Sequence, residues 1–173
     1  MKKRRTLAIV TMVALSLAAC GNKEEQLDVS TATVSLEEAV ETFHHTYSNA
    51  KLSSIELSEE KSKLMYSIDG FDETSEYTVH INESNEVAHQ EEEKREPNEQ
   101  YQELVLADYI TVKDALAKAA QATEVNDLTA TGWSLETENG TVVYSVQFED
   151  AQKEVEVMLD AKTGEQLFVE TDN

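Results

Sequence analysis

The sequence predicts an α+β fold made of two repeats, each with one helix packed across a three- to four-stranded antiparallel sheet. Three observations lead to this prediction. Segments with a similar order of residues recur about 77 positions apart. Each copy begins with apolar residues at helical spacing behind a capping residue. Each copy then continues with segments in which apolar and polar residues alternate, as in strands that bury one face.

The repeat rests on three pairs of matching segments. They are residues 34–40 with 110–116, residues 64–68 with 142–146, and residues 77–82 with 155–160. The offsets of 76, 78 and 78 differ only slightly, as expected if loop lengths have changed. Because the order of helix, tyrosine-bearing strand and alternating strand is the same in both copies, chance similarity is a poor explanation.

Each predicted helix begins at a residue that can cap it. Ser35 with Glu38 has the pattern of a capping box, and Thr111 with Asp114 is a weaker version of it. The apolar faces comprise Leu36, Ala39, Val40, Phe43 and Tyr47 in the first helix, and Val112, Ala115, Leu116 and Ala119 in the second. The second face is smaller, since an alanine stands where the first helix has a phenylalanine.

The predicted strands are marked by apolar residues with a period of two. These are Leu64, Tyr66 and Ile68; Tyr77, Val79 and Ile81; Trp133 and Leu135; Val142, Tyr144, Val146 and Phe148; and Val155, Val157 and Leu159. Asn139 and Gly140 predict a tight hairpin, because a type I′ turn needs positive φ at both central residues. Residues 160–164 predict a longer turn with Gly164 in the left-handed conformation, followed by a short strand over 166–170.

The N-terminus has the pattern of an export signal. Four basic residues in positions 1–5 precede an uncharged run of 13 residues, 7–19, which is shorter than the roughly 20 residues of a spanning helix. The run ends in Leu17-Ala18-Ala19-Cys20-Gly21, which resembles the lipobox of bacterial lipoproteins. The resemblance implies that Cys20 carries lipid and anchors the chain to the extracytoplasmic face of the cell membrane, in a host with one membrane or two.

These observations divide the chain into five parts. They are a lipoprotein signal peptide (1–19), a polar tether (20–33), a first repeat (34–91), a charged linker (92–108) and a second repeat (109–171). The pattern does not decide whether residues 101–109 form a strand, a helical turn or an extension packed on a repeat.

Composition restricts the partners of the protein. The chain has 35 acidic and 14 basic residues, a net charge of −21, and removal of residues 1–19 would make this −25. Such a surface repels phosphate backbones, so we expect no nucleic-acid partner. It also repels anionic lipid headgroups, so lipid on Cys20 rather than surface charge would hold the protein at a membrane. The single cysteine excludes an internal disulfide.

The repeat resembles the PepSY domain, and the second copy matches better. Its segments are Ile110-Thr111-Val112-Lys113-Asp114-Ala115-Leu116, the strand Val142–Phe148, and Val155–Glu165, which contains Asp160-Ala161-Lys162-Thr163-Gly164-Glu165. The first copy departs from this pattern in the last turn, where Asn82-Glu83-Ser84-Asn85-Glu86 contains no glycine. The resemblance implies no catalytic residues and no cofactor. It implies binding of a protein or peptide, such as an envelope peptidase that is restrained or regulated.

The side chains that could carry chemistry are few and scattered. The histidines are His44, His45, His80 and His89, and none has the His-x-x-x-His spacing of a helical metal site. We expect them to lie on the surface, and we expect Tyr66, Tyr144 and Trp133 to lie in the core. The sequence therefore predicts no catalytic, cofactor or metal residues. The alternative to a binding module is an acidic structural or cation-buffering envelope protein without a specific protein partner.

Overall fold

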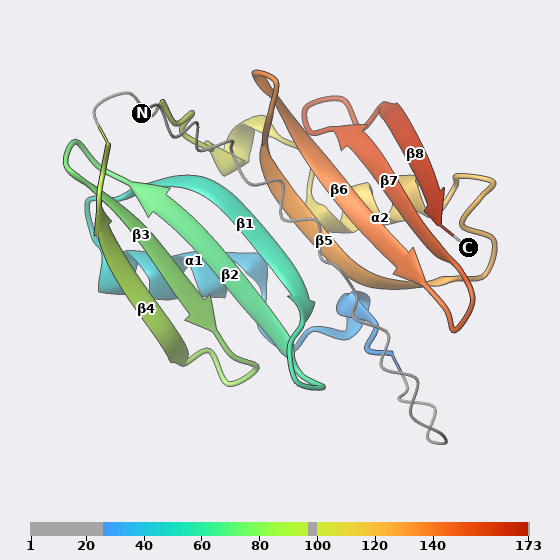
Figure 1. Ribbon diagram of the computed structural model, residues 1–173, viewed down its shortest axis with the longest axis horizontal. Helices are drawn as coiled ribbons and strands as arrows, with labels where there is room; N and C mark the ends of the chain where they lie inside the picture. Colours follow the sequence, from blue (N-terminus) through green and yellow to red (C-terminus); the bar gives the residue numbers. More distant parts are fainter. Residues whose placement is uncertain (1–25, 97–99, 173) are drawn as a thin grey trace, which may run out of the picture.

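The computed structural model describes residues 26–96 and 100–172, which form one open antiparallel sheet of eight strands with two short helices (Figure 1). The helical elements are η1 (Val29–Thr31), α1 (Leu36–Thr46), η2 (Leu106–Asp108) and α2 (Val112–Ala119). The strands are β1 (Lys51–Glu59), β2 (Leu64–Phe71), β3 (Ser75–Ile81), β4 (Val87–Lys94), β5 (Thr129–Glu138), β6 (Thr141–Glu149), β7 (Glu154–Asp160) and β8 (Gln166–Asp172). Their order in the sheet is β4-β3-β2-β1-β5-β6-β7-β8.

The predicted fold class is wrong. The chain does not form two separate repeats of a helix on a small sheet, because β1 pairs with β5 and joins all the strands into one mostly β structure. The joining register is Ile55 opposite Leu135, Glu56 opposite Ser134 and Leu57 opposite Trp133. An alternating pattern specifies which face of a strand is buried, but not which strand lies beside it. Pairing of β1 with β5 also removes two exposed strand edges.

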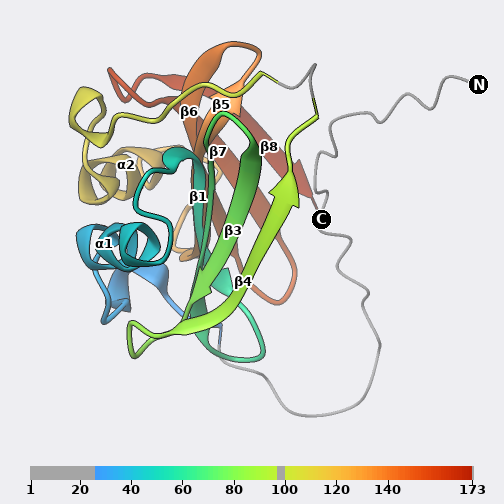
Figure 2. The ribbon, with the colours of Figure 1, turned by 90° about the vertical axis from the view of Figure 1, so that its left-hand side faces the viewer.

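Both helices pack on the same face of this sheet (Figure 2). α1 lies over β1–β4, which make up the first half of the sheet, and α2 lies over β5–β8, the second half (Figure 1). In the described part of the chain no helix packs on the opposite face, which is called the helix-free face. Strand residues that alternate with the buried core positions lie on it; they include Ser67, His80, His89, Ser145, Met158 and Phe168.

The predicted starts of both helices are confirmed. The Ser35 hydroxyl accepts a hydrogen bond from the Glu38 amide at 3.2 Å, and the Glu38 carboxylate accepts one from the Ser35 amide at 2.9 Å. The bonds that the Ser35 amide and hydroxyl donate to this carboxylate lower the pKa of Glu38 because they stabilise its charged form. In α2 the Thr111 hydroxyl accepts a hydrogen bond from the Asp114 amide at 3.1 Å. Local sequence therefore fixes where each helix begins.

The core lies between the helices and the sheet. Phe43 of α1 is fully buried over β2, and it packs there because Gly70 has no side chain: a Cβ at Gly70 would lie 2.5 Å from the Phe43 ring. α2 contributes only Ala115 and Ala119 as buried residues. The chain that follows α2 adds Ala122 and Val125, which are also buried.

The predicted turns form with the expected backbone conformations. Asn139 and Gly140 both have positive φ, at 48° and 83°, and Gly164 has φ 67°. The first half has no glycine at the corresponding turn, and Asn85 adopts the left-handed conformation there with φ 58°. Asparagine tolerates this conformation better than most residues, so the turn is retained without glycine.

The segment between the halves, left unassigned from the sequence, packs on the sheet. The Leu104 amide donates a hydrogen bond to the Leu52 carbonyl at 2.8 Å, and Leu104 is buried. The Tyr101 and Phe71 rings lie 5.3 Å apart, and the Arg95 guanidinium lies over both. The linker therefore adds contacts to the first half before α2 begins.

The predicted signal peptide and Cys20, the predicted site of lipid attachment, lie outside the described residues. Within the segment expected to be a tether, Val29 is buried in the core, so the packed part of the chain begins before residue 34. In the part of the chain that the structure describes, neither helix is long and apolar enough to cross a membrane.

Candidate functional site

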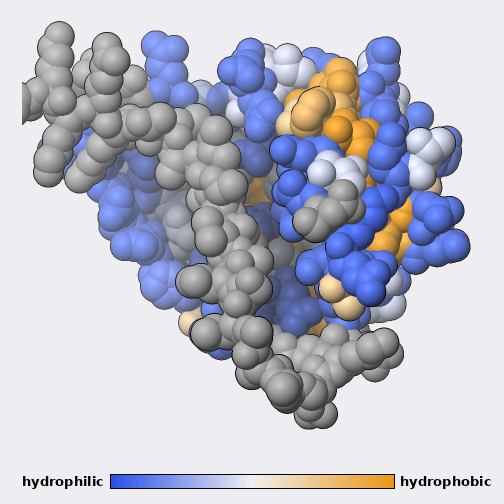
Figure 3. Space-filling view, turned by 45° about the vertical axis from the view of Figure 1, so that its right-hand side comes forward, coloured by the Kyte–Doolittle hydropathy of each residue, from blue (hydrophilic) through white to orange (hydrophobic). Residues whose placement is uncertain are grey.

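The sheet has two outer edges with different surfaces. Among the described residues, strands β4 and β8 each pair on one side only, so each leaves a row of backbone N–H and C=O groups without a strand partner on the other side. In β8, Leu167 is 50% exposed and Phe168 53% exposed. Figure 3, with the β8 side turned forward, shows apolar side chains gathered between hydrophilic ones on this part of the surface. The β8 edge thus combines backbone hydrogen-bonding capacity with apolar side chains.

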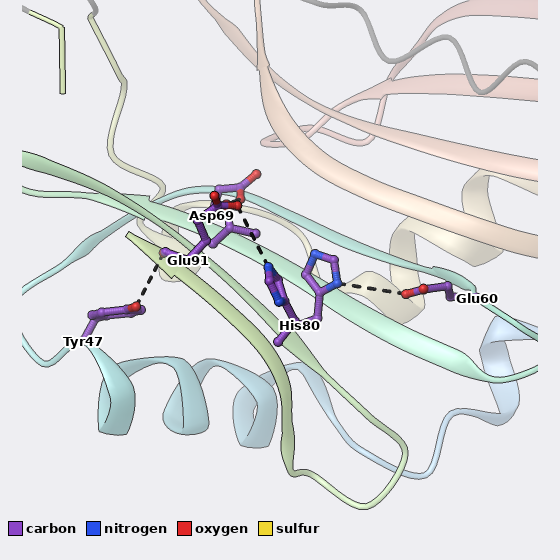
Figure 4. Close-up of polar contacts among 7 residues, drawn as sticks. Tyr47, Glu60, Asp69, His80 and Glu91 are labelled. Atoms are coloured by element: carbon purple, nitrogen blue, oxygen red, sulfur yellow. Dashed lines mark hydrogen bonds and ion pairs between the residues drawn. The ribbon is translucent and has the colours of Figure 1, made fainter. Parts of the chain in front are cut away.

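The β4 edge is protected by charge. Every residue of β4 is exposed, and its second half reads Glu91-Glu92-Glu93-Lys94. The Tyr47 hydroxyl of α1 donates a hydrogen bond to the Glu91 carbonyl at 3.5 Å (Figure 4). Charged side chains on an edge strand discourage the addition of another strand. Of the two edges, β8 is therefore the one suited to strand addition.

The charge near β8 limits what can bind there. The strand is flanked by Glu165 and contains Glu170 and Asp172, and the chain as a whole has a net charge of −21. A second acidic strand placed alongside would be repelled, whereas a cationic segment would be attracted. The geometry and charge together favour an extended, basic segment with apolar side chains.

The aromatic residues expected in the core are there. Trp133 is 3% exposed, and its ring lies 6.1 Å from that of Tyr66 and 6.2 Å from that of Tyr144. Since Tyr66 belongs to β2 and Tyr144 to β6, Trp133 joins the two halves of the sheet. It is a structural residue and not part of a recognition patch.

The two tyrosines make equivalent hydrogen bonds. The Tyr66 hydroxyl donates to the Val34 carbonyl at 3.1 Å, and the Tyr144 hydroxyl donates to the Ile110 carbonyl at 2.9 Å. Burial raises the pKa of each hydroxyl to about 12, because the charged phenolate is poorly solvated there. Each tyrosine fixes the chain just before a helix, which explains its place in the repeat.

The four histidines separate into two groups. His44 and His45 lie on α1, where His44 contacts the edge of Phe43 and His45 lies 3.7 Å from Glu41. His80 and His89 stand directly opposite each other on β3 and β4, with ring centres 5.4 Å apart. Sequence reasoning missed this pair, although the turn over residues 82–86 was a signal that positions on either side of it would face each other.

A small-molecule site is not supported by the pocket lined by residues of η1, β1 and β2. Its lining residues include Leu27, Ala32, Val34, Leu57, Leu64 and Tyr66, and its volume is about 80 Å³. Ligand pockets usually enclose about 300–1,000 Å³. Among the described residues, no group of three or more His, Cys, Asp or Glu side chains is already arranged to hold a metal ion.

Comparison with known proteins supports part of the sequence interpretation. Residues 109–170 match the sequence model of PepSY, the peptidase propeptide and YPEB domain. The match covers the second half of the sheet with α2, where the resemblance was seen to be better. No curated protein matches the chain.

Solved structures show a similar fold. A candidate lipoprotein from Clostridium difficile 630 is similar over 86% of this chain and 99% of its own, with 23% identity and a TM-score of 0.73. That coverage extends over both halves, so the joined sheet is a shared architecture. A DUF2874 family protein from Bacteroides uniformis covers 80% of this chain and 90% of its own at 14% identity, but its TM-score of 0.30 supports no conclusion.

Proposed function

We propose that this chain is a non-enzymatic lipoprotein, anchored through Cys20 to the extracytoplasmic face of the membrane, that binds an extended segment of another protein along β8. The partner we propose is an envelope peptidase that the protein restrains or regulates. The observation that carries the proposal is the β8 edge, with unpaired backbone groups beside the exposed Leu167 and Phe168. Strand addition at such an edge uses backbone hydrogen bonds for affinity and side-chain contacts for specificity.

The proposed link to peptidases rests on the PepSY match, whose description names peptidase propeptides. The proposed anchoring rests on the lipobox-like sequence before Cys20, and the similar Clostridium difficile protein is itself described as a candidate lipoprotein. Fold similarity alone does not establish a function, so the β8 surface remains the main support.

We also propose that the first half of the sheet, with α1, is itself a PepSY-like unit. It is joined to the matched second half through the β1–β5 pairing. Equivalent details support a duplication. The Tyr66 and Tyr144 hydroxyls bind carbonyls at matching positions, and both helices have capping residues in the same place. The outer hairpins both have a register shift at the same point, after His80 in one half and after Met158 in the other.

The strand-addition proposal is tested with proline in β8. Adjacent residues of an edge strand direct their amides to opposite sides, so one of Val169→Pro and Glu170→Pro removes an outward amide and leaves the β7–β8 pairing intact. A photocrosslinking residue at Leu167 in the full chain, expressed in living cells, first identifies the partner by mass spectrometry. The purified partner's affinity is then measured for each proline variant that keeps its thermal unfolding temperature.

We expect the folded proline variant to bind at least about tenfold more weakly, since each lost kcal/mol of binding energy lowers affinity severalfold. Val87→Lys on the opposite edge is the control and should bind normally. A set of immobilised peptides with equal apolar content and basic, neutral or acidic charge should show preference for the basic class. Unchanged binding by the folded proline variant would contradict strand addition at β8.

A further inference from the structure

The β3–β4 hairpin places two histidines side by side on the helix-free face. His80 and His89 are directly opposite in the strand register, and residues so placed have Cβ atoms about 4.5–5.5 Å apart. Their rings have centres 5.4 Å apart and planes at 67° to each other. The strand pairing therefore places the two imidazoles next to each other.

This spacing is that of two imidazoles on one metal ion. Zinc–nitrogen bonds are about 2.0–2.1 Å long, so two rings bound to a tetrahedral zinc ion have their centres about 5 Å apart. An edge-to-face contact between the rings has similar dimensions, and the experiment below separates the two cases. Both rings are accessible to an ion from solution, with the His80 side chain 32% and the His89 side chain 57% exposed.

Each histidine has a carboxylate beside it. The Glu60 Oε2 atom lies 4.0 Å from His80 Nδ1, and the Glu91 Oε2 atom lies 3.9 Å from His89 Nε2. These distances are too long for hydrogen bonds, so either carboxylate would have to move to join an ion held by the two imidazoles. Glu60 also pairs with Lys61 at 3.0 Å, so Glu91 has less competition for this role.

The chemistry of the group selects a class of ion. Two imidazoles with a carboxylate suit zinc, copper(II) or nickel(II), whereas calcium and magnesium prefer sites made only of oxygen ligands. The negative charge of the chain favours a cation at this face. We infer that His80 and His89, with Glu91 or Glu60, form a surface site for a divalent transition-metal ion.

The second half of the sheet has no histidines at the equivalent hairpin positions. The pair that precedes the register shift is His80 with His89 in the first half and Met158 with Phe168 in the second. Both pairs lie beside a serine of the neighbouring strand, Ser67 or Ser145. The hairpin geometry is common to both halves, and only the first half has metal-binding side chains in it.

The test is calorimetric titration of the mature chain with zinc chloride in a buffer that does not bind zinc. We expect one ion per chain with micromolar affinity, and no heat of similar affinity with calcium chloride. His80→Asn and His89→Asn should each weaken zinc binding by at least about 10- to 100-fold. Losses of this size follow when residues that only hydrogen-bond to metal ligands are replaced. His45→Asn removes an exposed histidine beside a carboxylate and is the matched control.

NMR spectra of the histidine rings give a second, independent measure. Zinc should shift the ring resonances of His80 and His89 together and leave those of His44 and His45 in place. The inference is overturned if the His80→Asn and His89→Asn variants, folded by circular dichroism, bind zinc as well as the unchanged chain, since binding would then come from scattered carboxylates. It is also overturned if the unchanged chain binds no zinc at micromolar concentrations.

Discussion

The outer hairpins of the two halves have the same backbone but opposite surface chemistry. Where the first half has His80 opposite His89 on the helix-free face, the second has Met158 opposite Phe168. The adjoining edges differ in the same way, because β4 carries charged residues and β8 exposes Leu167 and Phe168. The two halves thus supply two hairpins of similar geometry, and the side chains on each decide what it can bind.

The cores of the halves differ as well. α1 buries Phe43 against β2, whereas α2 has Ala119 at the corresponding place and depends on Ala122 and Val125 from the chain that follows it. In the first half one large aromatic side chain fills the space between helix and sheet, whereas in the second half several small side chains fill it. We therefore expect the first half to be more sensitive to a single substitution.

Replacement of Phe43 has the largest expected effect. Phe43→Ala should lower the free energy of unfolding by about 3–5 kcal/mol, because it removes a large buried ring and leaves a cavity. Ala119→Gly in the second half should cost only about 1 kcal/mol, mainly from helix propensity. Urea denaturation followed by fluorescence of Trp133, the single tryptophan, measures both. Equal losses would show that the two helices contribute alike and that the comparison of the cores is wrong.

Transfer of the histidine pair to the second half gives the next effect. Met158→His combined with Phe168→His should create a second zinc site, so the stoichiometry in a calorimetric titration should rise from one ion to two. The physical reason is that the strand register, which is shared, fixes the spacing of the rings. The matched control replaces the same two residues with asparagine. A stoichiometry that stays at one would mean that the carboxylates near His80 and His89 are indispensable.

The tyrosine hydroxyls should give the smallest and most equal effects. Tyr66→Phe and Tyr144→Phe each remove one hydrogen bond to a carbonyl, so each should lower stability by about 0.5–1.5 kcal/mol. Burial in the folded state raises both pKa values to about 12 from the ordinary tyrosine value of 10. Their contribution is therefore complete below pH 10 and is lost as the pH rises through about 12.

Thermal unfolding at a series of alkaline pH values checks this. The unchanged chain should lose stability above pH 10 more steeply than the chain with both tyrosines replaced by phenylalanine. Identical pH profiles would contradict the assigned role of the two hydroxyls. A much larger effect at one tyrosine than at the other would contradict their equivalence.

Much of the local structure was predictable because its signals lie within short segments. Ser35 and Thr111 mark the helix starts, since a hydroxyl at the cap binds an amide only three residues away. Asn139 and Gly140 mark the tight hairpin through their tolerance of positive φ. The burial of Tyr66 and Trp133 followed from their place in an alternating pattern.

The sequence by itself determined the elements and the faces they bury, because these depend on residue spacing along one segment. It did not determine that β1 and β5 join the halves into one sheet, since an alternating strand matches many possible neighbours equally well. The tertiary structure alone decided which strands remain at the edges, and so left β8 open with Leu167 and Phe168 exposed. It also decided that His80 and His89 meet, because their approach depends on the register of a hairpin and not on their separation in the chain.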